Sequence, residues 1–234
     1  MYGISHFIFY GSLFDKLFPG KNAQNAVGII DPENRTEQQV IIVGHHDSAY
    51  VFRYLKNHQS LYGFIMIMSI GSYLCGTAIS VYRFLFMVIS GHVLYSDVLM
   101  ILVIILSLAV LPLFFFITNE PSPGAGDNLI GSVIAIKLSS IFGKDNPLKM
   151  NLHKTRLVFL STDAEEAGQR GVKAYIRRHI RDIKSTPTYV LNIDSIYSYD
   201  DLTLLERDRN GLVPLSVLQN RKFHDIARQL GIEI

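Results

Sequence analysis

Two long apolar runs dominate the hydrophobic pattern of this chain. Residues 61–82 and residues 98–117 contain no charged side chain, and each run is long enough to cross the ~30 Å hydrocarbon core of a bilayer as a helix. Helices are expected because, in lipid, the backbone must satisfy its own hydrogen bonds. Buried core helices are the alternative, but two runs so long and so close together favour a transmembrane hairpin. Its connector is expected to hold Arg83, His92 and Asp97.

Shorter patterns outside these runs alternate between strands and helices. Strands are predicted at residues 25–30, 39–44, 156–161 and 188–194, with a further candidate at 202–205. Helices are predicted at residues 128–142, 165–181 and 213–230, and Gly231 then stands where a helix C-cap favours glycine. Near-continuous apolar runs at residues 40–43 and 157–160 suit central strands that are covered on both faces. The pattern predicts an α/β fold, a three-layer sandwich around a largely parallel mixed sheet.

The two apolar runs interrupt this domain. Residues 1–58 and 120–234 are predicted to be its two parts, and residues 59–119 the transmembrane insertion between them. Both parts must lie in one compartment, so the insertion must cross the bilayer an even number of times, and two spans meet this condition. The chain is therefore expected to be an integral, multi-pass membrane protein with the lipid bilayer as a partner.

The sequence leaves open the side of the membrane on which the domain lies. Arg53 and Lys56 flank the first run on the domain side, which favours a cytoplasmic domain by the positive-inside rule. The triplet Asn34-Arg35-Thr36 is a glycosylation sequon, which has meaning only for a lumenal domain. The two signals point in opposite directions.

Composition argues against several classes of function. A net charge of +2 gives no reason to expect a nucleic-acid-binding face, so nucleic acid is not an expected partner. The one cysteine, Cys75, lies in the first apolar run, which excludes disulfides within the chain and argues against thiolate metal ligands. Residues 1–14 are rich in aromatic side chains but lack the basic start and small-residue cleavage site of a cleavable signal peptide.

Acidic and imidazole side chains gather where the predicted strands end. Because the carboxyl ends of the strands in an open α/β sheet form the ligand-binding crevice, these groups are expected to converge. Any one of them has a simpler explanation as a helix N-cap, a first-turn acid or a loop residue. Capping does not explain all of them at equivalent strand ends. The residues are His45, Asp47, Asp127, Glu165, Glu166 and Asp194.

Such a cluster requires positive charge. Carboxylates gathered in a partly buried cleft repel one another unless a cation neutralises them. A mixed set of imidazole and carboxylate ligands suits Zn²⁺, and four or more carboxylates suggest two ions. The residues therefore predict a site for two zinc ions.

Four short motifs resemble, in order and spelling, those of the M28 zinc aminopeptidases, which are metallopeptidases with co-catalytic zinc ions. Each motif alone is weak, but four in this order, each on the expected element, form a specific pattern. The resemblance runs from about residue 25 to the C-terminus and skips the apolar hairpin. The motifs are His45-His46-Asp47-Ser48, Pro123-Gly124-Ala125-Gly126-Asp127-Asn128 with Gly131, Ala164-Glu165-Glu166 with Gly168 and Gly171, and Asn192-Ile193-Asp194.

The resemblance implies which residues bind metal. Asp127 would bridge the two zinc ions, and Glu166 would bind the second ion. The first ion would be bound by Asp194 and by His45, which the family pattern His-x-Asp selects over His46. The peptide bond that follows the bridging aspartate is typically cis in this family.

The resemblance also implies the chemistry. Glu165 would be the general base that takes a proton from water, and Asp47 would orient the ligands of the first ion. The chain would then be a membrane-anchored, zinc-dependent exopeptidase. It would act as an aminopeptidase that hydrolyses the N-terminal bond of a peptide or protein substrate.

One feature departs from the family pattern. The family takes a histidine of its second metal site from a loop well downstream of the aspartate that corresponds to Asp194, and here no histidine after Asp194 stands in a resembling motif. We expect the chain to be a piece of a longer protein, incomplete at its C-terminus. The alternative is a non-catalytic relative that acts as a membrane receptor or scaffold, which the four retained ligand positions disfavour. After Asp194 the sequence contains His224, within a predicted helix, and His153 and His179, which precede Asp194, are no better placed.

Two further functions fit the sequence less well. A transporter would place its ionisable side chains within the spans, whereas the clustered residues lie outside them. A single-zinc relative such as a glutaminyl cyclase is disfavoured because His45 together with Asp194 argues for two metals.

Overall fold

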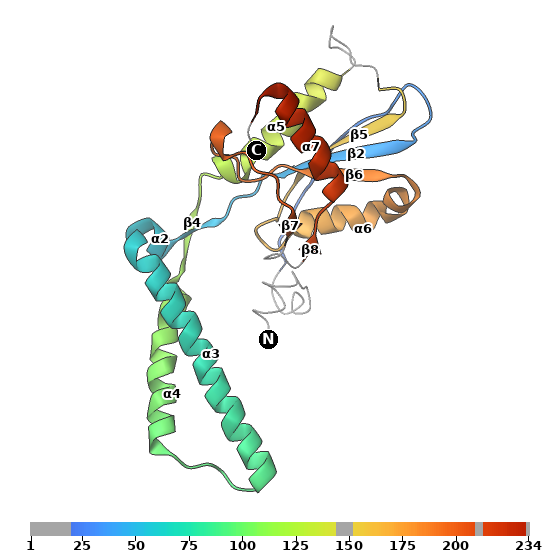
Figure 1. Ribbon diagram of the computed structural model, residues 1–234. Helices are drawn as coiled ribbons and strands as arrows, with labels where there is room; N and C mark the ends of the chain where they lie inside the picture. The colour runs from blue at the N-terminus through green and yellow to red at the C-terminus, as the bar shows by residue number, and fades with distance from the viewer. Residues whose placement is uncertain (1–19, 144–151, 209–212, 233–234) are drawn as a thin grey trace. The chain divides into compact units, whose positions relative to one another are not determined.

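A computed structural model describes residues 20–143, 152–208 and 213–232 of the chain (Figure 1). By its internal contacts the chain divides into two units, one formed by Met1–Ser48 with Pro123–Ile234 and the other by Ala49–Ser122. Residues 1–14, which lack the features of a signal peptide, lie outside the described part.

The first unit is built on a four-stranded sheet. Its order is β1 (Ala26–Ile30), β5 (Thr155–Thr162), β2 (Gln38–His45) and β6 (Thr188–Asn192). The last three strands are mutually parallel, and β1 runs antiparallel to β5. This confirms the prediction of an α/β fold with a largely parallel mixed sheet, and β1, β2 and β5 differ from their predicted ranges by at most one residue at each end. The fourth strand, β6, ends two residues before Asp194.

Each face of the sheet carries its own apolar cluster. Residues that alternate along β2 and β5 point to opposite faces, as the two-residue period of a strand requires. On one face they pack with Tyr175 of α6 (Arg170–Ser185), and on the other with Ala135 of α5 (Ile130–Phe142). Both faces are covered, which explains the near-continuous apolar sequence of the central strands. The first cluster contains Ile41, Val43, Val158 and Leu160, and the second contains Ile42, Leu157, Phe159 and Ile193.

The helices predicted at residues 128–142 and 165–181 begin later than their patterns indicate. A short π-helical turn, η3 (Ala125–Leu129), precedes α5, because Asp127 and Asn128 have non-helical backbone angles. The prediction that Glu165 opens a helix is wrong, since α6 begins only at Arg170. Positive φ angles at residues 164, 168 and 169 keep the preceding segment in a loop.

The C-terminal part also corrects the sequence-based ranges. Helix α7 (Val217–Leu230) begins after Ser216, whose hydroxyl accepts a hydrogen bond from the Gln219 N–H at 3.2 Å, so residues 213–216 are not helical. Gly231 ends α7 in the left-handed conformation (φ 69°), as predicted. The predicted strand at 202–205 is wrong, because the strand of this region is the two-residue β7 (Arg207–Asp208), paired with β8 (Val213–Pro214).

A close backbone contact sets the position of α5 against the sheet. A Cβ atom placed on Gly44 of β2 would lie 2.5 Å from the carbonyl carbon of Gly131 and 2.6 Å from the backbone nitrogen of Ser132. A Cβ atom on Gly131 would in turn lie 2.5 Å from the carbonyl oxygen of Ile193. The first turn of α5 therefore rests directly on the end of β2, and it lies close to Ile193, with the Asn128 side chain beside Gly131.

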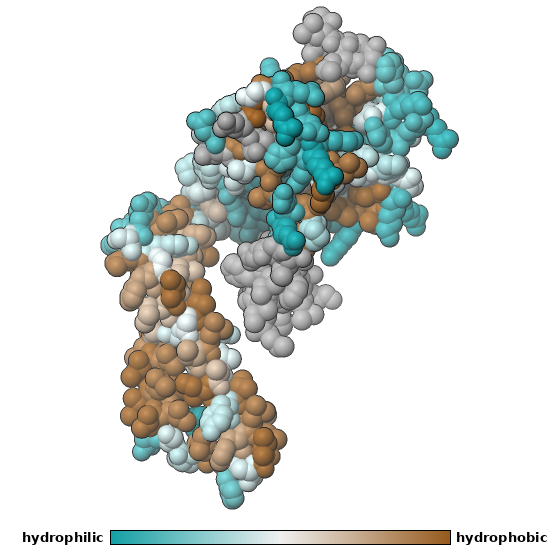
Figure 2. Space-filling view, in the orientation of Figure 1, coloured by the Kyte–Doolittle hydropathy of each residue, from teal (hydrophilic) through white to brown (hydrophobic). Residues whose placement is uncertain are grey.

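The second unit is a helical hairpin with a paired base. Strands β3 (Tyr50–Phe52) and β4 (Ile117–Pro121) are antiparallel, and a short helix α2 (Arg53–Asn57) leads into α3 (Gln59–Ser90). The return arm consists of α4 (Asp97–Val110) and the 3₁₀ turn η2 (Leu111–Phe115). Both arms are long and apolar enough to cross a membrane, and Figure 2 shows hydrophobic surface along them.

The ends of these two helices differ from the predicted spans. Helix α3 extends well beyond residue 82, so Arg83 lies within this helix and not in the connector. Its guanidinium donates a hydrogen bond to the carbonyl of Leu94 in the connector at 3.4 Å. Asp97 likewise begins α4. The second predicted span ends too late, because Ile117 already belongs to β4.

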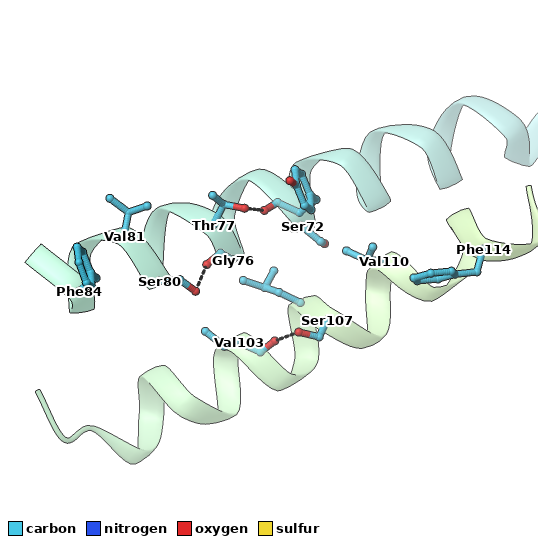
Figure 3. Close-up of a pocket in the computed structure, with 12 residues that line it drawn as sticks. Ser72, Gly76, Thr77, Ser80, Val81, Phe84, Val103, Ser107, Val110 and Phe114 are labelled. Carbon is cyan, nitrogen blue, oxygen red and sulfur yellow. Dashed lines mark hydrogen bonds between the residues drawn. The ribbon is translucent and has the colours of Figure 1, made fainter. Parts of the chain in front are cut away.

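Small and hydroxylated residues line a groove between α3 and α4 (Figure 3). The hydroxyls of Thr77, Ser80 and Ser107 each donate to the carbonyl four residues earlier in their own helix. The buried Ser69 hydroxyl instead donates to the Ala109 carbonyl of the other arm at 3.0 Å. All four hydroxyls thus have acceptors within the hairpin, which is what an apolar environment requires.

A third segment, Ala125–Phe142, also has the length and hydropathy to cross a membrane. Its Gly131, Ser132 and Ala135 are buried, and α5 packs on β2 and β5. The apolar residues of α5 therefore have a role in the core of the first unit.

Replacing Gly44 by alanine is expected to destabilise the first unit strongly. The new methyl group would overlap the backbone of α5, which cannot move away as a flexible side chain would, and overpacking of this kind costs roughly 1–3 kcal/mol or more. Gly28→Ala in β1 is the matched control, because its Cβ atom would meet nothing closer than 3.9 Å. Thermal unfolding of both purified variants tests this, and equal melting temperatures for Gly44→Ala and the unmodified protein would contradict it.

Candidate metal centre

The imidazole of His45 lies at the centre of the acidic cluster. His45 is the last residue of β2 and is only 3% exposed. Its Nε2 atom is 3.1 Å from Asp127 Oδ1, 3.6 Å from Asp194 Oδ1 and 4.0 Å from Glu165 Oε2. One nitrogen atom thus faces three carboxylates that come from three different segments of the chain.

Asp47 holds two parts of this cluster together. The Nδ1 atom of His45 lies 3.1 Å from the backbone oxygen of Asp47 and 3.4 Å from its Oδ1. The Asp47 carboxylate also accepts hydrogen bonds from the backbone N–H groups of Glu165 (3.0 Å) and Glu166 (3.1 Å). Asp47 therefore orients the imidazole ring and fixes the backbone of both glutamates.

The loop after β5 is shaped to present those two N–H groups. Ala164 adopts a left-handed conformation (φ 54°), which is uncommon for a residue with a side chain. The Asp163 carboxylate accepts the Ala164 N–H at 2.7 Å and the Gln24 N–H at 2.9 Å, which ties the loop to the segment before β1. The sharp turn at Ala164 places the backbone N–H groups of the next two residues within hydrogen-bonding distance of the Asp47 carboxylate.

Asn128 joins the segments that carry Asp127 and Asp194. Its side chain is completely buried; its Nδ2 donates to the Ile193 carbonyl at 2.7 Å and its Oδ1 accepts from the Gly131 N–H at 3.2 Å. The peptide bond between Asp127 and Asn128 is cis, as the family resemblance implies. Asn128 belongs to the motif that contains Asp127, but the sequence alone does not indicate that its side chain would link Ile193 to Gly131.

The cluster offers a set of atoms that could hold a cation. One ligand atom from each of His45, Asp127 and Glu166 lies within 4.8 Å of the others. Asp194 approaches the same imidazole nitrogen, and Glu165 lies slightly farther from it. The structure therefore brings together the residues that the sequence singled out, while their roles as ligands stay predictions.

The other histidines of interest lie outside this cluster. The His46 imidazole is exposed, with its Nδ1 atom 2.8 Å from Ser161 Oγ, which agrees with the choice of His45 as the inward-facing residue. The His153 ring pairs with Glu33 at 3.6 Å, and the His179 ring stacks on Tyr175 with ring centroids 4.4 Å apart. His224 lies within α7. In the described residues, no second histidine joins the cluster.

The cluster changes the proton affinity of its members. Burial raises the pKa of Glu165 to about 7 and also raises the pKa of Glu166. Burial alone would lower the pKa of His45, but the hydrogen bond with Asp194 and the charge of Glu165 outweigh it and raise that pKa to about 9. Burial likewise opposes ionisation of Asp194, yet its contact with His45 lowers the pKa of Asp194 overall. Without a cation, the site thus keeps a proton on His45 at neutral pH.

Comparison with known proteins gives one family match. The sequence model of Peptidase family M28 matches residues 107–232, which include Asp127, Glu165, Glu166 and Asp194. His45 and Asp47 precede the matched region, so their place in the site rests on the geometry described above. Comparison with curated proteins and with solved structures gives no match.

Zinc binding at pH 7.5 is expected to release about one proton for each occupied His45. A coordinating imidazole must be neutral, and the pKa of about 9 means that nearly every His45 carries a proton at this pH. Protons compete with the metal below that pKa, so zinc affinity should rise as the pH rises from 6 to 9. Titration calorimetry of the metal-free protein in buffers with different ionisation enthalpies counts the protons.

His45→Ala should abolish both the tight binding and the proton release. His153→Ala is the control, since this exposed histidine lies outside the cluster. Normal zinc binding by His45→Ala would remove His45 as a ligand, whereas zinc uptake without proton release would contradict a protonated His45 in the metal-free site.

Proposed function

The chain belongs to peptidase family M28, a family of zinc-dependent metallopeptidases, and from this premise we propose that it is a membrane-anchored aminopeptidase. One observation carries the proposal. Ligand atoms of His45, Asp127 and Glu166 converge within 4.8 Å, and a further glutamate, Glu165, stands beside them. The three residues could bind a metal ion, and Glu165 beside them could transfer protons.

The donor atoms fit zinc. Zn²⁺ binds imidazole nitrogen and carboxylate oxygen, and the charge of a divalent ion would offset the repulsion among these acids. In this proposal His45 and Asp194 would hold one ion, Glu166 would hold a second, and Asp127 would serve both. The contacts of His45 Nε2 with Asp127 Oδ1 (3.1 Å) and Asp194 Oδ1 (3.6 Å) support the first part of this assignment.

Glu165 is the proposed general base. When bound, zinc supplies Lewis acidity that lowers the pKa of water and polarises the scissile carbonyl. The Glu165 carboxylate takes the proton from the attacking water and passes it to the departing amine. Its backbone N–H is fixed by Asp47, so the carboxylate acts from a defined position beside His45.

The acidic character of the site favours an aminopeptidase. The N-terminus of a peptide would approach the metal ions and the acidic residues, of which Glu165 is not assigned to a metal ion. An N-terminus held there leaves only the first peptide bond within reach of the reacting water. The proposed substrate is therefore the free N-terminus of a peptide or protein.

A non-catalytic receptor or scaffold is the second candidate. It is favoured by one observation, that His45 is the one histidine in the cluster among the described residues. A scaffold would hold little stoichiometric zinc and hydrolyse nothing. Zinc content measured together with hydrolysis of aminoacyl amides separates the two functions.

Glu165→Gln is expected to keep zinc and to lower turnover by about 10²–10⁴-fold, because the amide cannot accept the proton. Glu166→Gln is the matched variant, since it makes the same chemical change at the adjacent position. It should instead lose zinc. Metal content by emission spectroscopy and kcat on aminoacyl amides are the two measurements, and normal turnover by Glu165→Gln would exclude Glu165 as the base.

We also propose that the Ala49–Ser122 unit anchors the protein in a bilayer. Its two arms are apolar along their length and expose large hydrophobic side chains over most of their surface (Figure 2). In water such a surface would promote aggregation. Lipid chains would cover it, while the backbone hydrogen bonds stay within the helices.

Arginine placed in the middle of α4 should weaken membrane insertion. In the double variant Ile105→Arg with Leu108→Arg, each arginine should raise the free energy of membrane insertion by about 2.5–3.5 kcal/mol, the cost of an arginine at the centre of a span. The full chain should remain in the membrane pellet after an alkaline wash, and the double variant should be partly released. Tyr95→Arg, in the connector and 88% exposed, should behave like the unmodified chain. Full release of the unmodified chain would contradict the anchor.

A further inference from the structure

The ring of Tyr197 rests on the residue that precedes Asp127. A Cβ atom placed on Gly126 would lie 2.3 Å from Tyr197 Cε1 and 2.4 Å from Cδ1. The aromatic ring thus occupies the space that a side chain at position 126 would need. It lies directly against the loop that presents Asp127 to the metal centre.

Tyr197 is also tied to the segment that carries Asp194. Ile193 and Ile196 both belong to the apolar cluster under α5, so this short segment is anchored at two points. Between them Ser195 takes a left-handed conformation (φ 53°), and its hydroxyl donates to Asp194 Oδ1 at 3.2 Å. The ring therefore stands at a defined place beside two of the proposed zinc ligands.

Despite this anchoring, Tyr197 is 71% exposed. One side of the ring meets Gly126, and most of the remaining ring surface is open to solvent. An aromatic ring held in this way adds little to the core. It does offer a flat apolar surface next to the reacting groups.

We propose that Tyr197 determines substrate specificity, by forming the wall on which the side chain of the substrate's N-terminal residue packs. The inference rests on the proposed aminopeptidase function. The ammonium and carbonyl groups of that residue flank its α-carbon, so binding both at the metal centre leaves its side chain close to Asp127 and Asp194. The ring of Tyr197 lies against Gly126, which precedes Asp127, and Tyr197 itself follows Asp194 by three residues. The ring favours apolar and aromatic side chains, which stack on it, over glycine and alanine.

The test compares hydrolysis of phenylalanyl, leucyl, alanyl and glycyl amidomethylcoumarins by the full chain in lipid vesicles. Tyr197→Ala should lower kcat/KM about 10-fold or more for the first two substrates and less than about 3-fold for the last two. Tyr197→Phe should keep the preference, because the ring and not the hydroxyl makes the contact. Tyr199→Ala is the matched control, an aromatic residue of similar exposure (64%) two positions along the same segment. An equal loss on all four substrates would overturn the inference.

A second readout does not depend on hydrolysis. The chain has no tryptophan, so the Tyr197→Trp variant carries a single indole at the proposed wall. Its emission should shift on titration with phenylalanine hydroxamate more than with glycine hydroxamate, and the Tyr199→Trp variant should respond to neither. If the unmodified chain hydrolyses nothing while the emission of the Tyr197→Trp variant responds selectively, the proposed function fails and the binding wall stands. If hydrolysis proceeds and that emission does not respond, the inference fails and the proposed function stands.

Discussion

The carboxylate of Asp47 is the group on which the arrangement of the site depends. It accepts two backbone hydrogen bonds from Glu165 and Glu166 and lies beside His45 Nδ1, so one side chain joins the end of β2 to the loop after β5. Hydrogen bonds to an ionised acceptor are roughly twice as strong as those between neutral groups. They offset the cost of the left-handed Ala164, which is of order 1–3 kcal/mol for such a conformation. The loop after β5 is therefore held against the end of β2 by polar contacts at the site itself, in addition to the pairing of β2 with β5.

The same two hydrogen bonds fix the backbone from which the side chains of both glutamates reach the cluster. Glu165 Oε2 lies 4.0 Å from His45 Nε2, and one oxygen of Glu166 lies within 4.8 Å of ligand atoms of His45 and Asp127. Both carboxyls are partly buried, and burial raises the pKa of each. A proton on His45 supplies part of the positive charge that the cluster needs, and a divalent cation would supply more. The electrostatics of the site thus suit a bound metal better than an empty cleft.

The sequence predicted the elements whose patterns are strong and local. Near-continuous apolar runs indicated β2 and β5, and the strand ends indicated where the acids would meet, because strand direction alone brings carboxyl ends to one edge. The error at Glu165 arose because a tertiary contact decided the local structure. Glu165 follows a strand and precedes a helical pattern, yet Asp47, remote in sequence, holds its N–H group outside any helix. Asn128 and Tyr197 were missed for the same reason, since their importance comes from contacts with Ile193 and Gly126 that no periodicity reveals.

The site also accommodates a long insertion between Asp47 and Asp127, because the two ends of the insertion are held together by contacts within each unit. Within the inserted unit, β3 pairs with β4 and the Ser122 N–H donates to the Ala49 carbonyl at 2.8 Å. Within the other unit, a Cβ atom on Gly124 would lie only 2.7 Å from Ser48 Cβ, so the two flanks touch there as well. The conformational cost of closing a loop grows only slowly with its length, and here the paired strands and helices of the insertion offset it. Asp127 therefore returns to His45 through contacts made on each side of the insertion, and the geometry of the candidate metal centre is held by contacts within its own unit.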